Sequence, residues 1–429
     1  MSMALATARH RVVPRRRPGR LTALVRAVRE RPEHAIIGTF AAAVAIAMTA
    51  DAATAASGLA RLNDFYSEAA PSYLALMHGH VLEFASLTPA YGGSLLLRAP
   101  SAMIPALWGG SLRAVYFASA LPCMLAAVAF CVWLAAQPRR RGASWPTRIV
   151  AVVCCIGNPI VLIVLLGGHP EEVLGAVLCV AAVVLAAGGR AEWAGLLAGL
   201  AVANKPWALV AVPVVVAVLP ARRGRALLLS AGSAAAVLLP LAAARGHGLS
   251  AAANGASVGA IFNPPQLLWW FGQRSWIVRE ARPGIVLASL LLTLLWRGAR
   301  RRAARPTASC EPDALLLLAL VLLLRAALDP WNNLWYHLPF LFALLAFEIR
   351  SGRPPRLMVA CTVALLIVVP VGGVPMSTDL RAAVYAAMVL PMIVGLVVKL
   401  YLPSGALGRL KPRRSRVSLR LSSDPAGLP

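Results

Sequence analysis

The amino-acid sequence predicts an all-α, polytopic membrane protein, and three observations support this fold class. Of the 429 residues, 59% are hydrophobic and 14% are charged, and the mean hydropathy is +0.72. The apolar residues form runs of about 15 to 25 residues, the length that a helix needs to cross the hydrocarbon of a bilayer. A soluble bundle would show a polar face on each helix, whereas residues 114–136 contain no charged residue. We expect roughly 10 to 12 membrane segments.

The basic residues predict how the chain is oriented. The formal net charge is +26, and lysine and arginine cluster in short segments between the apolar runs. Such clusters mark cytoplasmic loops in membrane proteins. We therefore expect a basic cytoplasmic leader (1–34), a membrane domain (35–402) and a basic cytoplasmic tail (403–429), in the inner (plasma) membrane. Because the charge is spread between membrane segments, we expect the bilayer, with some attraction to anionic lipids, and no nucleic acid as a partner.

The first half of the chain predicts helices interrupted by one long polar stretch. Residues 35–57 form the first helix, which we interpret as a signal anchor because a long basic leader precedes it. Residues 61–105 follow as a long first external loop that is too polar to cross the membrane. Two parts of this loop, 69–77 and 93–107, are apolar enough for interfacial helices along the outer leaflet. The next helices are expected at residues 112–136, 149–166 and 173–187.

The segment 193–220 predicts a broken hairpin. It lies between Arg190 and Arg222, two basic cytoplasmic markers that a single straight helix would place on opposite sides of the membrane. We expect its apex at Asn204-Lys205-Pro206-Trp207, because the residue before a proline is pushed out of the helical region.

The second half of the chain predicts further helices around a second external segment. Residues 226–243 form a helix that leads into this segment, which spans 245–283. The remaining helices are expected to end at Trp296, to cover 314–328, to end at Glu348, and to cover 357–374 and 382–402. In this topology every long polar connection is external and every basic connection is internal.

Acidic residues concentrate on the predicted external face, where we expect an active site. The acids on this face are Asp51, Asp64, Glu68, Glu83, Glu171, Glu172, Glu280, Asp329 and Asp379. Asp64 lies a few residues after the first helix, where a carboxylate can accept the proton of an attacking hydroxyl group. A solvated or helix-capping aspartate is the alternative interpretation. Asp51, at the end of an apolar run, is a rival candidate.

The turn at residues 167–172 places two further acids and a histidine between two apolar helices. Pro170, Glu171 and Glu172 suit the first turn of a helix for backbone and dipole reasons alone. In the functional alternative, His169 and Glu171 line the same cavity as Asp64 and bind hydroxyl groups or assist proton transfer.

Two basic residues at apolar positions predict an anion site. Lys205 is costly to place in hydrocarbon, so it should meet water or an anion such as a lipid phosphate, unless it snorkels to an interface. Arg325 and Asp329 are four residues apart and can pair on one helix face, or Arg325 can bind phosphate instead. His337 begins the next helix and could approach Asp64.

Motifs for other chemistries are weak. His78, His80, Asp64 and Glu171 are possible ligands of a divalent metal, but a lone His-x-His is a weak signal, so we expect no metal and no other cofactor. The sequence shows no Walker-type loop, dinucleotide-binding glycine pattern or nucleophile elbow in a suitable context. This argues against ATP-driven transport and hydrolase chemistry.

Three stretches together resemble the GT-C class of integral-membrane glycosyltransferases, in particular the family 87-like, polyprenol-phosphate-mannose-dependent transferases. They are residues 63–80, which begin Asn-Asp-Phe-Tyr, residues 199–207 (Gly-Leu-Ala-Val-Ala-Asn-Lys-Pro-Trp) and residues 329–339 (Asp-Pro-Trp-Asn-Asn-Leu-Trp-Tyr-His-Leu-Pro). The similarity of layout covers residues 35–402.

The resemblance implies an inverting transfer of a sugar, mannose in this family, from a polyprenyl-phosphate donor to an acceptor hydroxyl on a lipid or cell-envelope glycan at the external face. The first-loop acid is the general base in such enzymes, and that role would pass to Asp64. Because Asn63-Asp64 is not a paired-acid motif, the second acid stays open between Glu68, Glu171 and none. The expected site therefore has Asp64, Glu171 and His337 as catalytic residues, Lys205 and Arg325 at the donor phosphate, and Tyr66, Glu68, His80, His169, Asp329 and Asn333 at the substrates.

Two other functions compete with this one. A secondary transporter or lipid flippase could use the same charges, although the sequence has no convincing internal repeat and its polar residues gather at one face. A scaffold subunit of an envelope-assembly complex would need no shared cavity for Asp64, Lys205 and Arg325.

Overall fold

A computed structural model describes the chain over residues 32–58, 63–89, 91–136, 145–244, 265–302, 310–369 and 376–402. Within these residues the secondary structure is helical and contains no β-strand. Most of the expected leader, the expected tail and residues 245–264 of the second external segment lie outside the described part.

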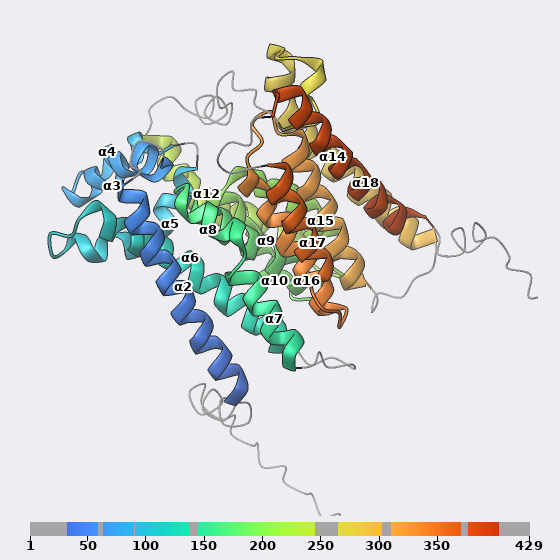
Figure 1. Cartoon of the computed structure of the whole chain (residues 1–429), viewed down its shortest axis with the longest axis horizontal. Helices are drawn as coiled ribbons and strands as arrows, with labels where there is room; N and C mark the ends of the chain where they lie inside the picture. Colours follow the sequence, from blue (N-terminus) through green and yellow to red (C-terminus); the bar gives the residue numbers. More distant parts are fainter. Residues whose placement is uncertain are drawn as a thin grey trace, which may run out of the picture.

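The N-terminal third forms one side of the molecule. The long helix α2 (Pro32–Gly58) packs along α6 (Leu112–Ala136), and three short helices lie where α2 ends (Figure 1). These are α3 (Ala70–Met77), α4 (Val81–Leu87) and α5 (Gly92–Ala106), preceded by the single π-helical turn η2 (Phe65–Ala69). The prediction of helices at 69–77 and 93–107 within the first loop is therefore confirmed.

The next helix is broken where one continuous helix was expected. Residues 149–166 were predicted as one element, but the structure has α7 (Trp145–Ile156) and α8 (Pro159–Leu166). Asn158 separates them, because its Oδ1 caps α8 by accepting a hydrogen bond from Ile160 N at 2.9 Å. Its Nδ2 donates to Thr362 Oγ1 at 3.2 Å, which ties the break to α17 (Arg356–Val368).

The broken hairpin is confirmed. Helix α9 (Pro170–Ala187) turns into α10 (Ala191–Asn204), which ends at Asn204, and the chain returns through the 3₁₀ turn η3 (Pro206–Val210) and α11 (Ala211–Val218). The two ends of the hairpin meet, since Arg222 Nη1 lies 3.2 Å from Glu192 Oε1. Lys205 is therefore at the apex.

Small residues allow α10 to approach α12 (Arg223–Ala244) closely. A Cβ added at Gly195 would lie 2.4 Å from the carbonyl oxygen of Ala226, and one at Gly199 would lie 2.2 Å from that of Ser230. Glycines four residues apart are a common device for helix packing in membranes. This packing holds the first half of the hairpin in place.

The C-terminal half surrounds two buried helices. Helices α15 (Cys310–Leu328) and α16 (Leu338–Arg350) pack on each other and on α9, and their side chains form much of the core. Around them lie α14 (Ser275–Arg302), α17 and α18 (Thr378–Tyr401) (Figure 1). The second external segment was predicted to extend to residue 283. Helix α14 already begins at Ser275 and contains Pro283, so the predicted end of this segment is about eight residues too late.

The described residues contain six helices that are long and apolar enough to cross a membrane. They are Ala35–Gly58, Leu112–Ala136, Pro146–Leu166, Pro170–Ala187, Arg223–Ala244 and Thr378–Tyr401, and the apolar helices Pro206–Val218 and Arg356–Val368 are shorter. Large apolar side chains such as Phe40, Leu228 and Ile367 are exposed on the outside, as expected where lipid replaces water. The chain is a multi-pass helical membrane protein, and the expected total of segments stays a prediction.

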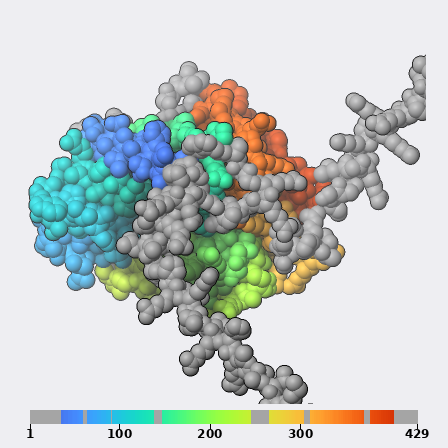
Figure 2. Space-filling view, turned by 90° about the horizontal axis from the view of Figure 1, so that it is seen from below, coloured from blue at the N-terminus to red at the C-terminus, as the bar shows by residue number. Residues whose placement is uncertain are grey.

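The N-terminal and C-terminal thirds of the chain lie on different sides of the molecule. Figure 2 shows the N-terminal third on one side, residues near 200 in the middle and the C-terminal third on the other side. Charged pairs gather at one end of the bundle, where Arg222 meets Glu192, Arg300 meets Asp313 and Arg350 meets Glu311. The turn from α8 to α9 and the hairpin apex lie at the opposite end.

Candidate functional site

The start of the first loop is fixed to the turn between α8 and α9. Asn63 Nδ2 donates to the carbonyl oxygen of Leu166 at 2.6 Å, and Asp64 N donates to that of Gly167 at 3.1 Å. Gly168 has a φ of +86°, and a Cβ there would lie 2.5 Å from Phe65 N. A glycine is therefore required for this turn to sit against the loop.

Asp64 and Glu171 are joined through His169. Asp64 Oδ2 lies 2.6 Å from His169 Nε2, and Glu171 Oε1 lies 2.9 Å from His169 Nδ1. Two carboxylates on one ring require a hydrogen on each nitrogen when both acids are ionised, so the ring is an imidazolium. Burial lowers the pKa of His169, but the hydrogen bonds to Asp64 and Glu171 outweigh it and raise this pKa to about 9.

Glu171 is the centre of the network. Its side chain is fully buried, and Lys205 Nζ lies 3.1 Å from Oε1 while Arg98 Nη2 lies 3.2 Å from Oε2. Asn204 Nδ2 also donates to the backbone oxygen of Glu171 at 2.8 Å. Both carboxylate oxygens are therefore used. Such pairing is what an acid needs to stay ionised at a buried position.

Arg98 is a site residue that the sequence interpretation missed. It comes from α5 in the first loop, and it is only 2% exposed. An arginine in an apolar interfacial helix is usually taken to snorkel toward water. The available signal was its position in the middle of the Leu-Leu-Leu-Arg-Ala-Pro run, where only a buried carboxylate could compensate its charge.

The hairpin apex brings Lys205 to a second acid, Glu172. Lys205 Nζ lies 3.5 Å from Glu172 Oε1 and 4.1 Å from the centre of the Tyr91 ring. Trp207 Nε1, from the returning half of the hairpin, donates to the same Oε1 at 3.3 Å. A lysine that is costly in hydrocarbon is thus neutralised by two acids from the first turn of α9.

Arg325 reaches the same place from α15. Its Nη2 lies 3.8 Å from Glu172 Oε1, and its Nη1 donates to the backbone oxygen of Tyr336 at 3.0 Å. The guanidinium carbon lies 3.9 Å from the Tyr336 ring centre and 4.8 Å from that of Trp207. Cation–π contacts of this kind fix the plane of the guanidinium.

The ion pair between Arg325 and Asp329, one of the two alternatives for Arg325, does not form. Helix α15 ends at Leu328, so Asp329 leaves the helical register that would bring it under Arg325. Asp329 Oδ1 instead lies 3.3 Å from Arg282 Nη2 and accepts from Trp331 N at 3.0 Å.

Tyr91 links the network to Glu68. Tyr91 Oη donates to Glu68 Oε2 at 2.6 Å, and its ring lies 6.2 Å from that of His169. Burial raises the pKa of the Tyr91 hydroxyl well above its ordinary value, which keeps it a donor. Trp335 also packs near His169, with its ring centre 5.1 Å from that of His169. Glu68 therefore belongs to the same group of side chains as Asp64.

Other predicted residues lie apart from these contacts. His80 Nδ1 lies 2.9 Å from Glu83 Oε2 at an exposed turn. His337 Nε2 lies 2.8 Å from Tyr385 Oη on α18 and Nδ1 lies 3.2 Å from the backbone oxygen of Leu334, so both ring nitrogens contact groups other than Asp64. Tyr66 stacks edge-on against Phe65, and its buried hydroxyl has no partner. The backbone oxygen of Asn333 accepts from Tyr336 N at 3.0 Å.

The arrangement offers an accessible carboxylate, which can accept a proton, and a positively charged region, which can bind an anion. At one end Asp64 is the accessible group, because its side chain is 34% exposed whereas that of His169 is 8% exposed. At the other end Lys205 and Arg325 supply positive charge. In the described part of the chain, no group of three or more histidines, cysteines or acids is placed to hold a metal ion.

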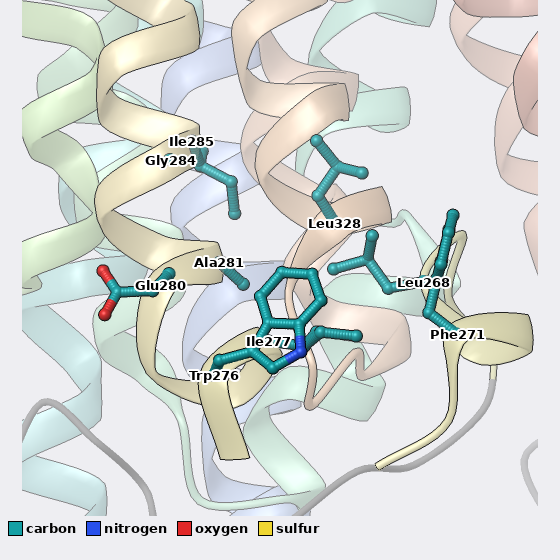
Figure 3. Close-up of a pocket in the computed structure, with 9 residues that line it drawn as sticks. All are labelled: Leu268, Phe271, Trp276, Ile277, Glu280, Ala281, Gly284, Ile285 and Leu328. Atoms are coloured by element: carbon teal, nitrogen blue, oxygen red, sulfur yellow. The ribbon is translucent and has the colours of Figure 1, made fainter. Parts of the chain in front are cut away.

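A separate apolar pocket lies beyond Arg325. It has a volume of about 260 Å³ and is lined by α14, by Leu328 at the end of α15, and by Leu268 and Phe271 at the start and end of the 3₁₀ turn η4 (Trp269–Phe271). Figure 3 shows Trp276 and Leu328 facing into it, while the carboxylate of Glu280 points away. None of its lining residues belongs to the network around Glu171.

A comparison of the chain with protein-family models, with curated proteins and with solved structures finds no match. The fold and the candidate site therefore rest on the chain's own residues.

Proposed function

We propose that this protein is an integral-membrane glycosyltransferase of the GT-C class, similar to family 87. It moves a sugar, mannose on this resemblance, from a polyprenyl-phosphate donor to an acceptor hydroxyl on a lipid or cell-envelope glycan at the external face of the plasma membrane. One observation carries the proposal: Asp64, Lys205 and Arg325 come from three distant segments and join one continuous network through His169, Glu171 and Glu172.

The reaction needs a base and a place for negative charge. The acceptor hydroxyl gives its proton to the free oxygen of Asp64 while its oxygen forms a bond to the anomeric carbon of the sugar. The bond from that carbon to the phosphate oxygen breaks, and its electron pair leaves with the polyprenyl phosphate. Positive charge from Lys205 and Arg325 stabilises this departing phosphate. Attack from the face opposite the phosphate inverts the sugar centre.

The network supports Asp64 in this role. The imidazolium of His169 holds Asp64 in one orientation. Glu171 in turn needs Arg98 and Lys205 to remain ionised, so these residues act on the reaction through His169. Glu171 is then a positioning acid, because both of its oxygens are already bonded.

The surroundings of Arg325 favour a lipid donor. The apolar pocket begins at Leu328, one helical turn from Arg325 on α15, so a phosphate at Arg325 would have an apolar site beside it for part of its prenyl chain. The orientation of the site toward the cell exterior rests on the positive-inside rule.

One observation favours a secondary transporter or lipid flippase as a second candidate. Helices interrupted near a charged group often form the substrate site of transporters, and the hairpin breaks at Lys205. A transporter would move its substrate without breaking a glycosidic bond.

The test is transfer of radiolabelled sugar from polyprenyl-phosphate-mannose in membranes that contain the wild type or Asp64→Asn. The proposal expects labelled product with the wild type and about 100- to 10,000-fold less with the variant. Equal turnover by both proteins would remove Asp64 as the base. No turnover with any lipid-linked sugar, together with movement of the lipid across vesicles, would favour transport.

A further inference from the structure

Glu172 is a fully buried acid that the proposed reaction does not use. Its Oε2 has no hydrogen-bond partner, although its side chain is 0% exposed. Its Oε1 has three donors at longer distances, namely Trp207 Nε1 at 3.3 Å, Lys205 Nζ at 3.5 Å and Arg325 Nη2 at 3.8 Å. Glu171, by contrast, has partners on both oxygens at 2.9 to 3.2 Å. Glu172 is therefore the more weakly held of the two adjacent acids.

Arg325 has one donor edge that is not satisfied. Its Nη1 is bonded to Tyr336, but its buried Nε has no partner and its Nη2 meets Glu172 only at the long distance. The Nε–H and Nη2–H groups of a guanidinium point in the same direction, which is the fork that binds two oxygens of a carboxylate or phosphate. The rings of Tyr336 and Trp207 hold this fork in a fixed plane.

Glu172 does not fill this fork. A carboxylate that paired fully with Arg325 would place both oxygens within about 3 Å of Nε and Nη2. Instead one oxygen is shared with Lys205 and Trp207, and the other is unpaired. The unpaired Oδ1 of Asn204, next to Lys205, marks a further unsatisfied acceptor close by.

Resting on the proposed function, we infer that Glu172 is a displaceable counter-ion, which the phosphate of the lipid donor replaces on the Nε and Nη2 edge of Arg325. Before the donor binds, Glu172 compensates the charge of Arg325, which would otherwise be buried without a partner. When the phosphate binds, Glu172 stays with Lys205 and Trp207. No bond is made or broken in this exchange. Glu172 weakens donor binding, and for the same reason it helps polyprenyl phosphate to leave.

The pair Glu172→Gln and Glu171→Gln tests this inference, because the same change is made at adjacent buried acids. Steady-state transfer is measured in detergent with purified full-length protein. For Glu172→Gln the KM for the donor should fall by about three- to tenfold, and inhibition by polyprenyl phosphate should strengthen by a similar factor. For Glu171→Gln kcat should fall by about 100-fold with little change in KM. A KM that is unchanged or raised in Glu172→Gln would overturn the inference.

A second variant and a binding measurement cover the case in which Glu172→Gln does not fold. Glu172→Asp keeps the charge but withdraws the carboxylate from Arg325, so KM should again fall. Thermal unfolding is measured with polyprenyl phosphate and, separately, with inorganic phosphate. The comparison shows whether the site binds the phosphate of a lipid or free phosphate. Greater stabilisation of the variant than of the wild type by the lipid supports the inference, even if the wild type transfers no sugar and the proposed function fails. Greater stabilisation by inorganic phosphate alone would overturn the lipid as the ligand.

Discussion

His169 Nε2 lies 2.6 Å from Asp64 Oδ2, and this contact joins two segments that are 105 residues apart in the sequence. The orientation of Asp64, the base of the proposed reaction, therefore depends on a histidine in the turn between α8 and α9. We therefore expect His169→Gln to lower kcat by about 10- to 100-fold with little change in the KM for the donor. The measurement is steady-state transfer of labelled sugar. A KM effect without a kcat effect would show that His169 contacts substrate instead.

The stability of the protein should depend on the protonation of His169. Its pKa in the folded protein is raised to about 9 from an ordinary value of 6.5, since hydrogen bonds to Asp64 and Glu171 outweigh burial. A group whose pKa is raised on folding contributes stability that is fully present below the unfolded pKa. This contribution is lost as the pH rises from about 6.5 through about 9. The melting temperature should therefore fall over this range in the wild type more than in His169→Gln, and parallel curves would contradict this prediction.

Gly168 should be needed for activity because of the space it leaves for the first loop. Its φ is +86°, and a Cβ would lie 2.5 Å from Phe65 N. Gly79 is a matched control, with a φ of +79° and nothing within 4 Å of its Cβ position. Each change to alanine should cost roughly 1 to 2 kcal/mol of backbone strain. Only Gly168→Ala should displace Asp64 and reduce kcat, by about 100-fold. Equal kcat in both variants would argue against this role for the turn.

Arg98 should matter for both stability and catalysis. Arg98→Met leaves Glu171 with one uncompensated oxygen in a buried place, and loss of one partner of a buried pair costs about 3 to 5 kcal/mol. Adding Glu171→Gln to Arg98→Met should restore part of the melting temperature without restoring kcat. Additive losses of stability in the double variant would mean that the two side chains do not interact.

Much of the fold could be predicted from the sequence, because apolar run length and charge placement are strong signals in membrane proteins. Helix α6 has the predicted bounds, and the hairpin apex at Lys205 followed from two arginines and one proline. The break at Asn158 was missed because the run around it is apolar, although Asn-Pro is a common start of a helix. The pattern of apolar residues does not show that a helix ends and a new one begins inside such a run.

The candidate site was less predictable. Asp64, His169, Glu171, Lys205 and Arg325 were named from charge and position, and the structure brings them together. Arg98 and the counter-ion position of Glu172 were not predicted, because which acid meets which base depends on tertiary packing. For the same reason the possible pairing of Asp329 with Arg325 could not be decided from the sequence, and Asp329 meets Arg282 instead. The roles of all these residues in sugar transfer stay predictions.

The most direct test measures kcat and KM for transfer from polyprenyl-phosphate-mannose with the wild type, Asp64→Asn and Arg325→Met in the same membrane preparation. If one site holds both the base and the phosphate, Asp64→Asn should lose kcat by about 100-fold or more at a nearly unchanged KM, whereas Arg325→Met should raise KM as well as lower kcat. Wild-type activity that survives both substitutions would contradict the proposed sugar transfer at Asp64 and Arg325.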